Sequence, residues 1–134
     1  MSTMTKQLLL QDLCSRLLCG VVCRINFTYS NETTFGEEVE NEVDDTISMI
    51  NTKRETVFAD YLGCEFDIEC VKPYLRSMDD MTEEERKEYK HLVAFSGNPD
   101  GAASFTDWLN KHHFDYRGLI WKGLALEALD EMYK

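Results

Sequence analysis

The hydrophobic period of the chain changes at Gly20, and this change limits the possible folds more than any other feature. Before it, leucines such as Leu9 and Leu13 recur every fourth residue, which is the spacing of one helix face. After it, apolar and polar residues alternate over residues 21–29, which indicates a strand with one buried face. We therefore predict a helix over residues 4–18, ended by the permissive backbone of the glycine and followed by a strand.

Three later stretches also have the composition of strands. Residues 46–50 and 55–60 are short and rich in β-branched and aromatic residues, with a polar turn between them. Residues 64–71 alternate most regularly, and Pro73 is expected to end this strand because proline cannot donate to a ladder. One face of the 64–71 strand is expected to be buried and the other to carry carboxylates, as in antiparallel sheets. The expected buried residues are Cys64, Phe66, Ile68 and Cys70.

The second half of the sequence predicts helices. Thr82 and Glu85 have the spacing of a capping box, so we expect a helix over residues 82–95. Its buried face would consist of Tyr89, Leu92 and Val93.

A further helix is expected to run to about residue 113. It would begin at Ser104, or at Ala102 with Asp100 as its cap. Its apolar face follows a helical spacing and consists of Phe105, Trp108, Leu109 and His112. Beyond it, Asp115 and Gly118 predict a turn, and the remaining apolar pieces fit short helical turns or a small terminal strand.

These patterns together predict one α+β domain over residues 1–134. It would contain an N-terminal helix, a small antiparallel sheet of three to four strands, and two or three C-terminal helices packed on one face. A chain of 134 residues is long enough to build one hydrophobic core without disulfides or metals.

Charge is the strongest global signal, because the net charge is −11 at pH 7. An acidic surface repels phosphate backbones and anionic membranes, so we expect neither direct nucleic-acid binding nor membrane association. It favours a protein partner with a basic surface. The densest acids lie in a segment over residues 30–45, predicted to be a mobile loop because like charges repel. They are Glu37, Glu38, Glu40, Glu42, Asp44 and Asp45.

Two smaller groups complete the candidate partner-binding residues. Asp79 and Asp80 form a second acidic patch. Tyr116 and Arg117 lie in the predicted turn at residues 115–118, and the alternative interpretation is an exposed pair at an interface hot spot, where these residue types are enriched. The oligomeric state is left open.

The histidines and cysteines carry the alternative chemistry. Neighbouring helical residues point in different directions, so His112 and His113 are not expected to converge on one metal ion. We expect one at the edge of the core and one at the surface. The five cysteines match no standard zinc spacing, and we expect reduced thiols in a cytoplasmic protein without cofactors. The sequence also shows no apolar stretch long enough to cross a membrane.

The second half of the chain also carries a resemblance. The strings of residues that carry it are Val71 to Met78, Met81 to Glu85, Asp107 to Asn110, and His112 to Ile120 with Lys122 to Ala128. They resemble a group of small uncharacterised acidic proteins of gut Bacteroidales genomes, many of which lie in phage or other mobile elements. The resemblance is good over residues 70–134. The resemblance implies a bacterial, mobile-element context and no particular reaction.

Charge and context together lead to our functional hypothesis. We expect a non-enzymatic protein-binding module, such as an anti-CRISPR-like inhibitor that occupies the basic nucleic-acid-binding surface of a host defence nuclease. One alternative is a small metal- or thiol-dependent enzyme that uses His112, His113 and a cysteine. Another is a structural or oligomerising accessory protein.

Overall fold

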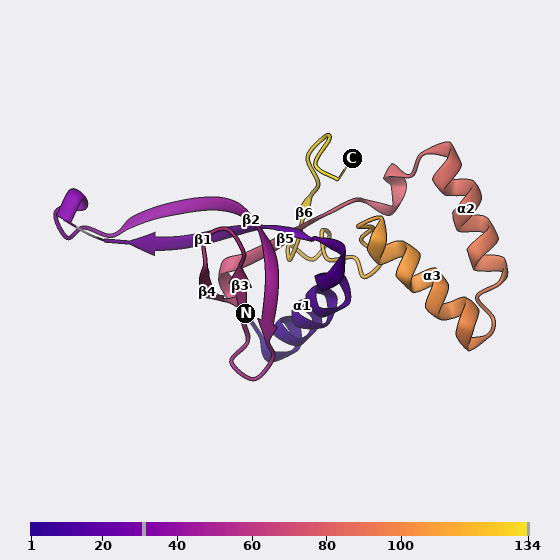
Figure 1. The fold of residues 1–134 in the computed structure, drawn as a ribbon, viewed down its shortest axis with the longest axis horizontal. Coiled ribbons are helices and arrows are strands. Elements are labelled where there is room, and N and C mark those ends of the chain that lie inside the picture. The colour runs from indigo at the N-terminus through magenta and orange to yellow at the C-terminus, as the bar shows by residue number, and fades with distance from the viewer. Residues whose placement is uncertain (31, 134) are drawn as a thin grey trace. The chain divides into compact units, whose positions relative to one another are not determined.

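A computed structural model describes residues 1–30 and 32–133 of the chain, so Asn31 in the predicted acidic loop lies outside the described residues (Figure 1). The fold is α+β, as the sequence predicts. The chain divides into two compact units, Met1–Pro73 and Tyr74–Lys134. The helices are α1 (Thr3–Arg16), α2 (Glu83–Ala94) and α3 (Pro99–Lys111). The strands are β1 (Val22–Tyr29), β2 (Val39–Asn51), β3 (Thr56–Ala59), β4 (Cys64–Asp67), β5 (Val71–Leu75) and β6 (Leu126–Glu127).

Helix α1 begins and ends through local signals that are visible in the sequence. The hydroxyl of Ser2 accepts a hydrogen bond from the backbone N–H of Thr5 at 3.1 Å, which caps the first turn. A short 3-10 turn follows the helix, and Gly20 then takes a φ of 71° that glycine adopts without strain. The leucine face is buried, with Leu9 and Leu13 at 0% exposure. The predicted N-terminal helix is therefore confirmed.

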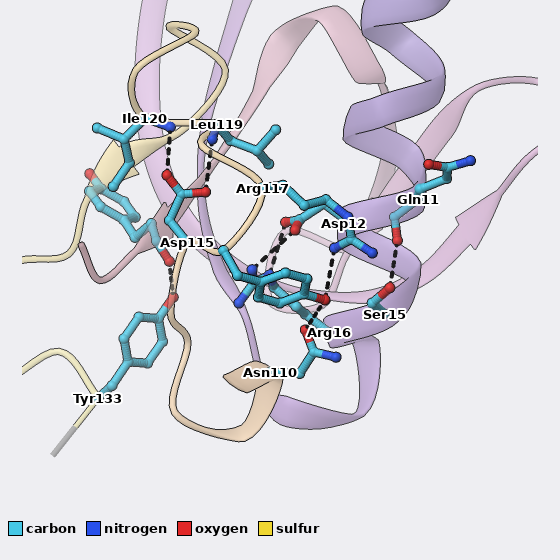
Figure 2. A network of polar contacts seen from close by, with 12 residues as sticks. Gln11, Asp12, Ser15, Arg16, Asn110, Asp115, Arg117, Leu119, Ile120 and Tyr133 are labelled. Atoms are coloured by element: carbon cyan, nitrogen blue, oxygen red, sulfur yellow. Dashed lines mark hydrogen bonds and ion pairs between the residues drawn. The ribbon is translucent and has the colours of Figure 1, made fainter. Parts of the chain in front are cut away.

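Two oppositely charged side chains of α1 form a buried ion pair (Figure 2). Arg16 follows Asp12 by one helical turn, and both side chains are 0% exposed. The guanidinium donates through Nε to Oδ2 at 2.9 Å and through Nη2 to Oδ1 at 3.1 Å. Two hydrogen bonds hold the charges together where water cannot solvate them.

The sheet is larger than predicted. Its six strands follow the hydrogen-bonded order β4-β3-β2-β1-β5-β6. All pairs within residues 1–73 are antiparallel, whereas the last two residues of β5 pair in parallel with β6. The prediction of a purely antiparallel sheet of three to four strands is therefore wrong. The sequence did not reveal a separate β5, whereas β6 lies where a small terminal strand was one of the two possibilities.

The segment predicted as one strand over residues 64–71 is two strands. Strand β4 stops at Asp67, whose carboxylate accepts a hydrogen bond from the N–H of Glu69 at 2.9 Å and begins a 3-10 turn. Of the four residues expected to be buried, Ile68 is buried, Phe66 and Cys70 are half-buried, and Cys64 is exposed. Pro73 lies inside β5, opposite Cys23 of β1, and does not end the strand.

Each unit has its own apolar core. In the first unit the most buried side chains include Val21, Cys23 and Ile25 of the segment around β1, all at 0% exposure. In the second unit Met81, Leu109 and Phe114 form the buried centre. Partly buried residues pack against that centre, namely Met78, Tyr89, Phe105, Trp108 and Tyr116.

The two C-terminal helices are confirmed, with corrections to their details. The capping box of α2 forms as predicted between Thr82 and Glu85. None of the α2 side chains is fully buried, however, and Val93 is 44% exposed. Helix α3 begins earlier than predicted, at Pro99, because the side chain of Asn98 accepts a hydrogen bond from the N–H of Gly101 at 2.7 Å.

Candidate protein-binding surface

The acidic segment that we predicted as a mobile loop contains the first part of strand β2, residues 39–45, and a 3-10 turn over Glu32–Thr34. Strand β2 pairs with β1 along its outer half, from Tyr29 opposite Val39 to Val22 opposite Thr46. In Figure 1 this hairpin extends away from the rest of its unit. We call its outer part, residues 26–29 and 39–44, the acidic ribbon. The loop prediction was wrong for residues 39–45, because pairing with β1 outweighs the repulsion between the carboxylates.

Alternation gives the acidic ribbon two different faces. Glu40, Glu42 and Asp44 lie at every second position of β2, so they share one face of the ribbon. All three are exposed. The opposite face carries Phe27, which is half-buried against the ring of Phe66 at a centroid distance of 5.5 Å. The ribbon therefore presents a row of carboxylates on one side and apolar side chains on the other.

One cation partly offsets the charge of this row. Arg24 of β1 lies directly opposite Asp44 in the register. Its guanidinium lies 3.7 Å from Asp44 and 3.9 Å from Glu42, and these side chains are 37%, 41% and 63% exposed, respectively. Such exposed pairs contribute little stability. The row therefore keeps a net negative charge.

Asp45 has a structural role that the sequence analysis did not identify. It is only 7% exposed. Its carboxylate accepts hydrogen bonds from the N–H groups of Tyr61 at 3.1 Å and Leu62 at 2.9 Å, and from its neighbour Thr46 at 2.7 Å. These contacts hold the connection between β3 and β4. The expectation that Asp45 is part of a solvated acidic loop was wrong.

The remaining predicted acids are exposed. Glu37 and Glu38 precede β2, directly after a turn in which Phe35 and Gly36 take φ values of 55° and 79°. Asp79 and Asp80 lie in the second unit, in a 3-10 turn (Met78–Asp80) whose first N–H groups are capped by Ser77.

Tyr116 and Arg117 are half-buried and do not form a fully exposed pair. The hydroxyl of Tyr116 donates to Oδ1 of Asn110 at 2.8 Å and accepts from Arg117 at 2.9 Å (Figure 2). The guanidinium of Arg117 also lies over the Tyr116 ring, 4.7 Å from its centroid. These contacts fix the pair in place.

The turn after α3 is held by Asp115, in agreement with the prediction. Its carboxylate accepts hydrogen bonds from the N–H groups of Leu119 at 2.8 Å and Ile120 at 2.9 Å (Figure 2). Gly118 takes a φ of 71°, which a residue with a side chain rarely adopts. The aspartate is buried and serves the backbone.

The two histidines follow the last turn of α3. His112 is half-buried and His113 is buried, so the prediction that one histidine lies at the surface was wrong. His113 takes a left-handed φ of 63°. The N–H of His113 bonds to Asn110, and the N–H of Phe114 bonds to Leu109, which is the pattern of a Schellman motif. Ring contacts hold both imidazoles: the His112 ring lies tilted against the Trp108 ring at a centroid distance of 4.5 Å, and the His113 ring stacks on the Tyr133 ring at 3.6 Å.

Sequence analysis missed the strongest ion pair of the second unit. Arg76 donates to Glu85 through two nitrogens, at 2.9 and 2.8 Å, and its guanidinium lies 4.3 Å from the centroid of the Phe114 ring. The hydrogen bonds from Arg76 lower the pKa of Glu85 to about 2, and the same contact raises the pKa of Arg76. The sequence identified Glu85 only through its capping box.

Two of the five thiols are poor candidates for nucleophilic chemistry. Burial raises the pKa of Cys23, and the nearby carboxylates Asp12 and Asp45 raise it further. Burial also raises the pKa of Cys70, with smaller contributions from Asp67 and Glu69. A thiol with a raised pKa is poor in the thiolate that acts as a nucleophile.

Within the described part of the chain, no three histidine, cysteine, aspartate or glutamate side chains are grouped closely enough to hold a metal ion. None of the helices built from the described residues is long and apolar enough to cross a bilayer.

Comparisons of the chain with protein-family models, with curated proteins and with solved structures found no match. The geometry of the chain itself is therefore the basis for a functional proposal.

Proposed function

We propose that this chain is a non-enzymatic protein-binding module whose acidic ribbon occupies a basic, nucleic-acid-binding surface of another protein. The observation that carries the proposal is the row of Glu40, Glu42 and Asp44 on one face of a projecting hairpin. In the mobile-element context that the sequence resemblance implies, a nucleic-acid-guided defence nuclease of the host fits this description of a partner.

The spacing of the row supports this choice of partner. Alternate residues of a strand are about 6.5–7 Å apart, so three carboxylates cover roughly 13 Å. A nucleic-acid strand also presents regularly spaced negative charges, one for about every 3.4 Å of helix axis. A groove lined with lysine and arginine to hold phosphates therefore attracts a rigid row of carboxylates through the same charges.

The structure changes the set of residues on which the proposal rests. Glu37, Glu38, Glu40, Glu42 and Asp44 are exposed and remain in the set. Asp45 is removed from it, because its carboxylate is used by backbone N–H groups of its own unit. Asp79, Asp80, Tyr116 and Arg117 belong to the second unit and remain candidates for a secondary contact.

The test is capture of partners by two variants with equal charge loss. One variant carries Glu40→Gln, Glu42→Gln and Asp44→Asn in the acidic ribbon. The control carries Glu83→Gln, Glu84→Gln and Asp107→Asn, which removes the same charge from exposed helical positions of the second unit. Each immobilised protein is incubated at low salt with a bacterial lysate, and bound proteins are then displaced with single-stranded DNA.

We expect the wild type and the control to retain proteins that the DNA displaces, and we expect the ribbon variant to lose them. Raising the salt concentration should release them as well, because screening weakens exposed charge pairs. Equal capture by the ribbon variant and the control would show that only net charge matters and would overturn the proposal.

A further inference from the structure

We propose that the outer edge of β2, over Val39–Asp44, binds an extended segment of the partner as an added strand, and that this segment carries lysine or arginine at every second position. The inference rests on the proposed function and adds the mode of recognition and the chemistry of the recognised segment. Its starting point is the backbone of β2.

The outer edge of β2 carries no neighbouring strand over these residues. Strand β1 pairs with the inner edge from Val39 to Thr46, whereas β3 pairs with the outer edge only over Ile47–Asn51. Between these regions, the N–H of Asp60 donates to the carbonyl of Thr46 at 2.9 Å. Among the described residues, no strand pairs with the outer edge of Val39–Asp44.

A strand edge that lacks a neighbouring strand is a template for strand addition. Alternate residues of Val39–Asp44 direct their backbone N–H and C=O groups away from β1, because these groups alternate along an antiparallel strand. These groups form strong hydrogen bonds with an extended peptide that aligns beside them. A two-stranded ribbon is also marginally stable by itself, so a third strand would stabilise it.

The side chains of β2 specify the sequence of the added strand. Residues directly opposite each other on neighbouring strands have Cβ atoms about 4.5–5.5 Å apart. On one face, Glu40, Glu42 and Asp44 would therefore lie opposite every second residue of the segment, where lysine or arginine would form ion pairs. On the other face Asn41 lies between Val39 and Val43, and the two valines favour apolar, β-branched neighbours. The preferred segment thus alternates basic and apolar residues.

Charge also argues against a second copy of this chain at the same edge. Two β2 edges aligned in antiparallel register around Glu42 would place carboxylates of one copy opposite carboxylates of the other. Like charges directly opposite each other are destabilising, and the net charge of −11 adds a general repulsion. The edge therefore selects a basic segment and disfavours self-association.

The experiment uses synthetic peptides as the probe. The first is a short peptide in which lysine and valine alternate, and the second has the same composition in two blocks, all lysines before all valines. Two further peptides alternate as the first does, but one is N-methylated at every lysine and the other at every valine. N-methylation keeps the charge and blocks hydrogen bonding along one edge of the peptide, so one of the two should lose binding. Dissociation constants are measured by fluorescence anisotropy with the full chain.

We expect the alternating peptide to bind at least about tenfold more tightly than the block peptide, and one N-methylated peptide to lose a similar factor through its missing hydrogen bonds. Backbone amides of Val39–Asp44 should exchange hydrogen more slowly in the complex. If all four peptides bind equally and only the ribbon variant loses binding, strand addition is overturned while the proposed function stands. If the ribbon variant binds them as the wild type does, both are overturned. No measurable binding of the alternating peptide also overturns strand addition.

Discussion

Asp12 and Arg16 form a two-bond ion pair one helical turn apart in α1, with both side chains fully removed from solvent. A buried pair of this kind adds little stability compared with an apolar pair of the same size. Removing one partner has a large effect, because the other charge then stays buried without its counter-charge.

We therefore expect Asp12→Ala to lower the free energy of unfolding by about 3–5 kcal/mol. The measurement is urea unfolding followed by circular dichroism. The double variant Asp12→Leu, Arg16→Met should recover much of the loss, since it removes both charges together. Asp107→Ala on the exposed side of α3 is the control and should change stability by less than about 0.5 kcal/mol. A small effect of Asp12→Ala would mean that Arg16 reaches solvent.

A second prediction concerns acid unfolding and Glu85. Its pKa is about 2 in the folded chain, below its ordinary value, because Arg76 holds the carboxylate charged. A group with a lowered folded pKa stabilises the fold above its unfolded pKa, and this contribution is lost as the pH falls toward the folded pKa. The loss is therefore expected between about pH 4.5 and pH 2.

Glu85→Gln should reduce stability by about 1–3 kcal/mol at neutral pH, and its difference from the wild type should shrink as the pH falls through that window. Stability is measured by urea unfolding at several pH values. Glu84→Gln, at the neighbouring exposed position, is the control, and its free energy of unfolding should change with pH as that of the wild type does. A difference that does not change with pH would contradict the role assigned to the Arg76 contact.

A third prediction separates two acids that are close in sequence. Asp45→Ala should reduce stability by about 1–3 kcal/mol, because the buried N–H groups of Tyr61 and Leu62 lose their acceptor. Glu42→Gln should leave stability within about 0.5 kcal/mol and weaken binding to a basic peptide. Thermal unfolding and peptide titration of both variants test this contrast. If the two variants lost the same stability, the buried position of Asp45 and the exposed position of Glu42 would be contradicted.

A fourth prediction tests the corrected start of α3. Asn98→Ala should reduce stability by about 0.5–2 kcal/mol, since it removes the acceptor for the Gly101 N–H. Asp100→Ala, at the position predicted as a cap from the sequence, should have a smaller effect, because a first-turn acid contributes only about 0.3–1 kcal/mol through the helix dipole. Chemical unfolding of the two variants ranks them, and the reverse order would restore the sequence-based assignment.

The sequence predicts well those elements whose signals are local. The α+β class follows from the change of hydrophobic period at Gly20, and the start of α2 follows from Thr82 and Glu85. Both depend on residues within a few positions of each other. The turn at Asp115 and Gly118 was likewise visible, because its chemistry is contained in the residues themselves.

The features that the sequence did not reveal depend on distant partners. Residues 39–45 form a strand because β1 pairs with them. Their carboxylates alternate with other residues as in a strand, but the sequence-based prediction considered only the repulsion between like charges. The role of Asp45 depends on N–H groups of Tyr61 and Leu62. The spacing of Asp12 and Arg16 was visible, but their burial depends on tertiary packing.

Asp45 also marks a boundary for sequence variation. On its inner side Ile47 is buried, so substitutions of Ile47 reduce the stability of the fold. Residues on its outer side, such as Glu42 and Glu40, are exposed on a ribbon whose geometry depends mainly on its backbone ladder. Mutations can therefore accumulate in the ribbon without loss of the scaffold. Evolution or protein engineering could therefore change the binding specificity of the ribbon while the scaffold beyond Asp45 stays the same.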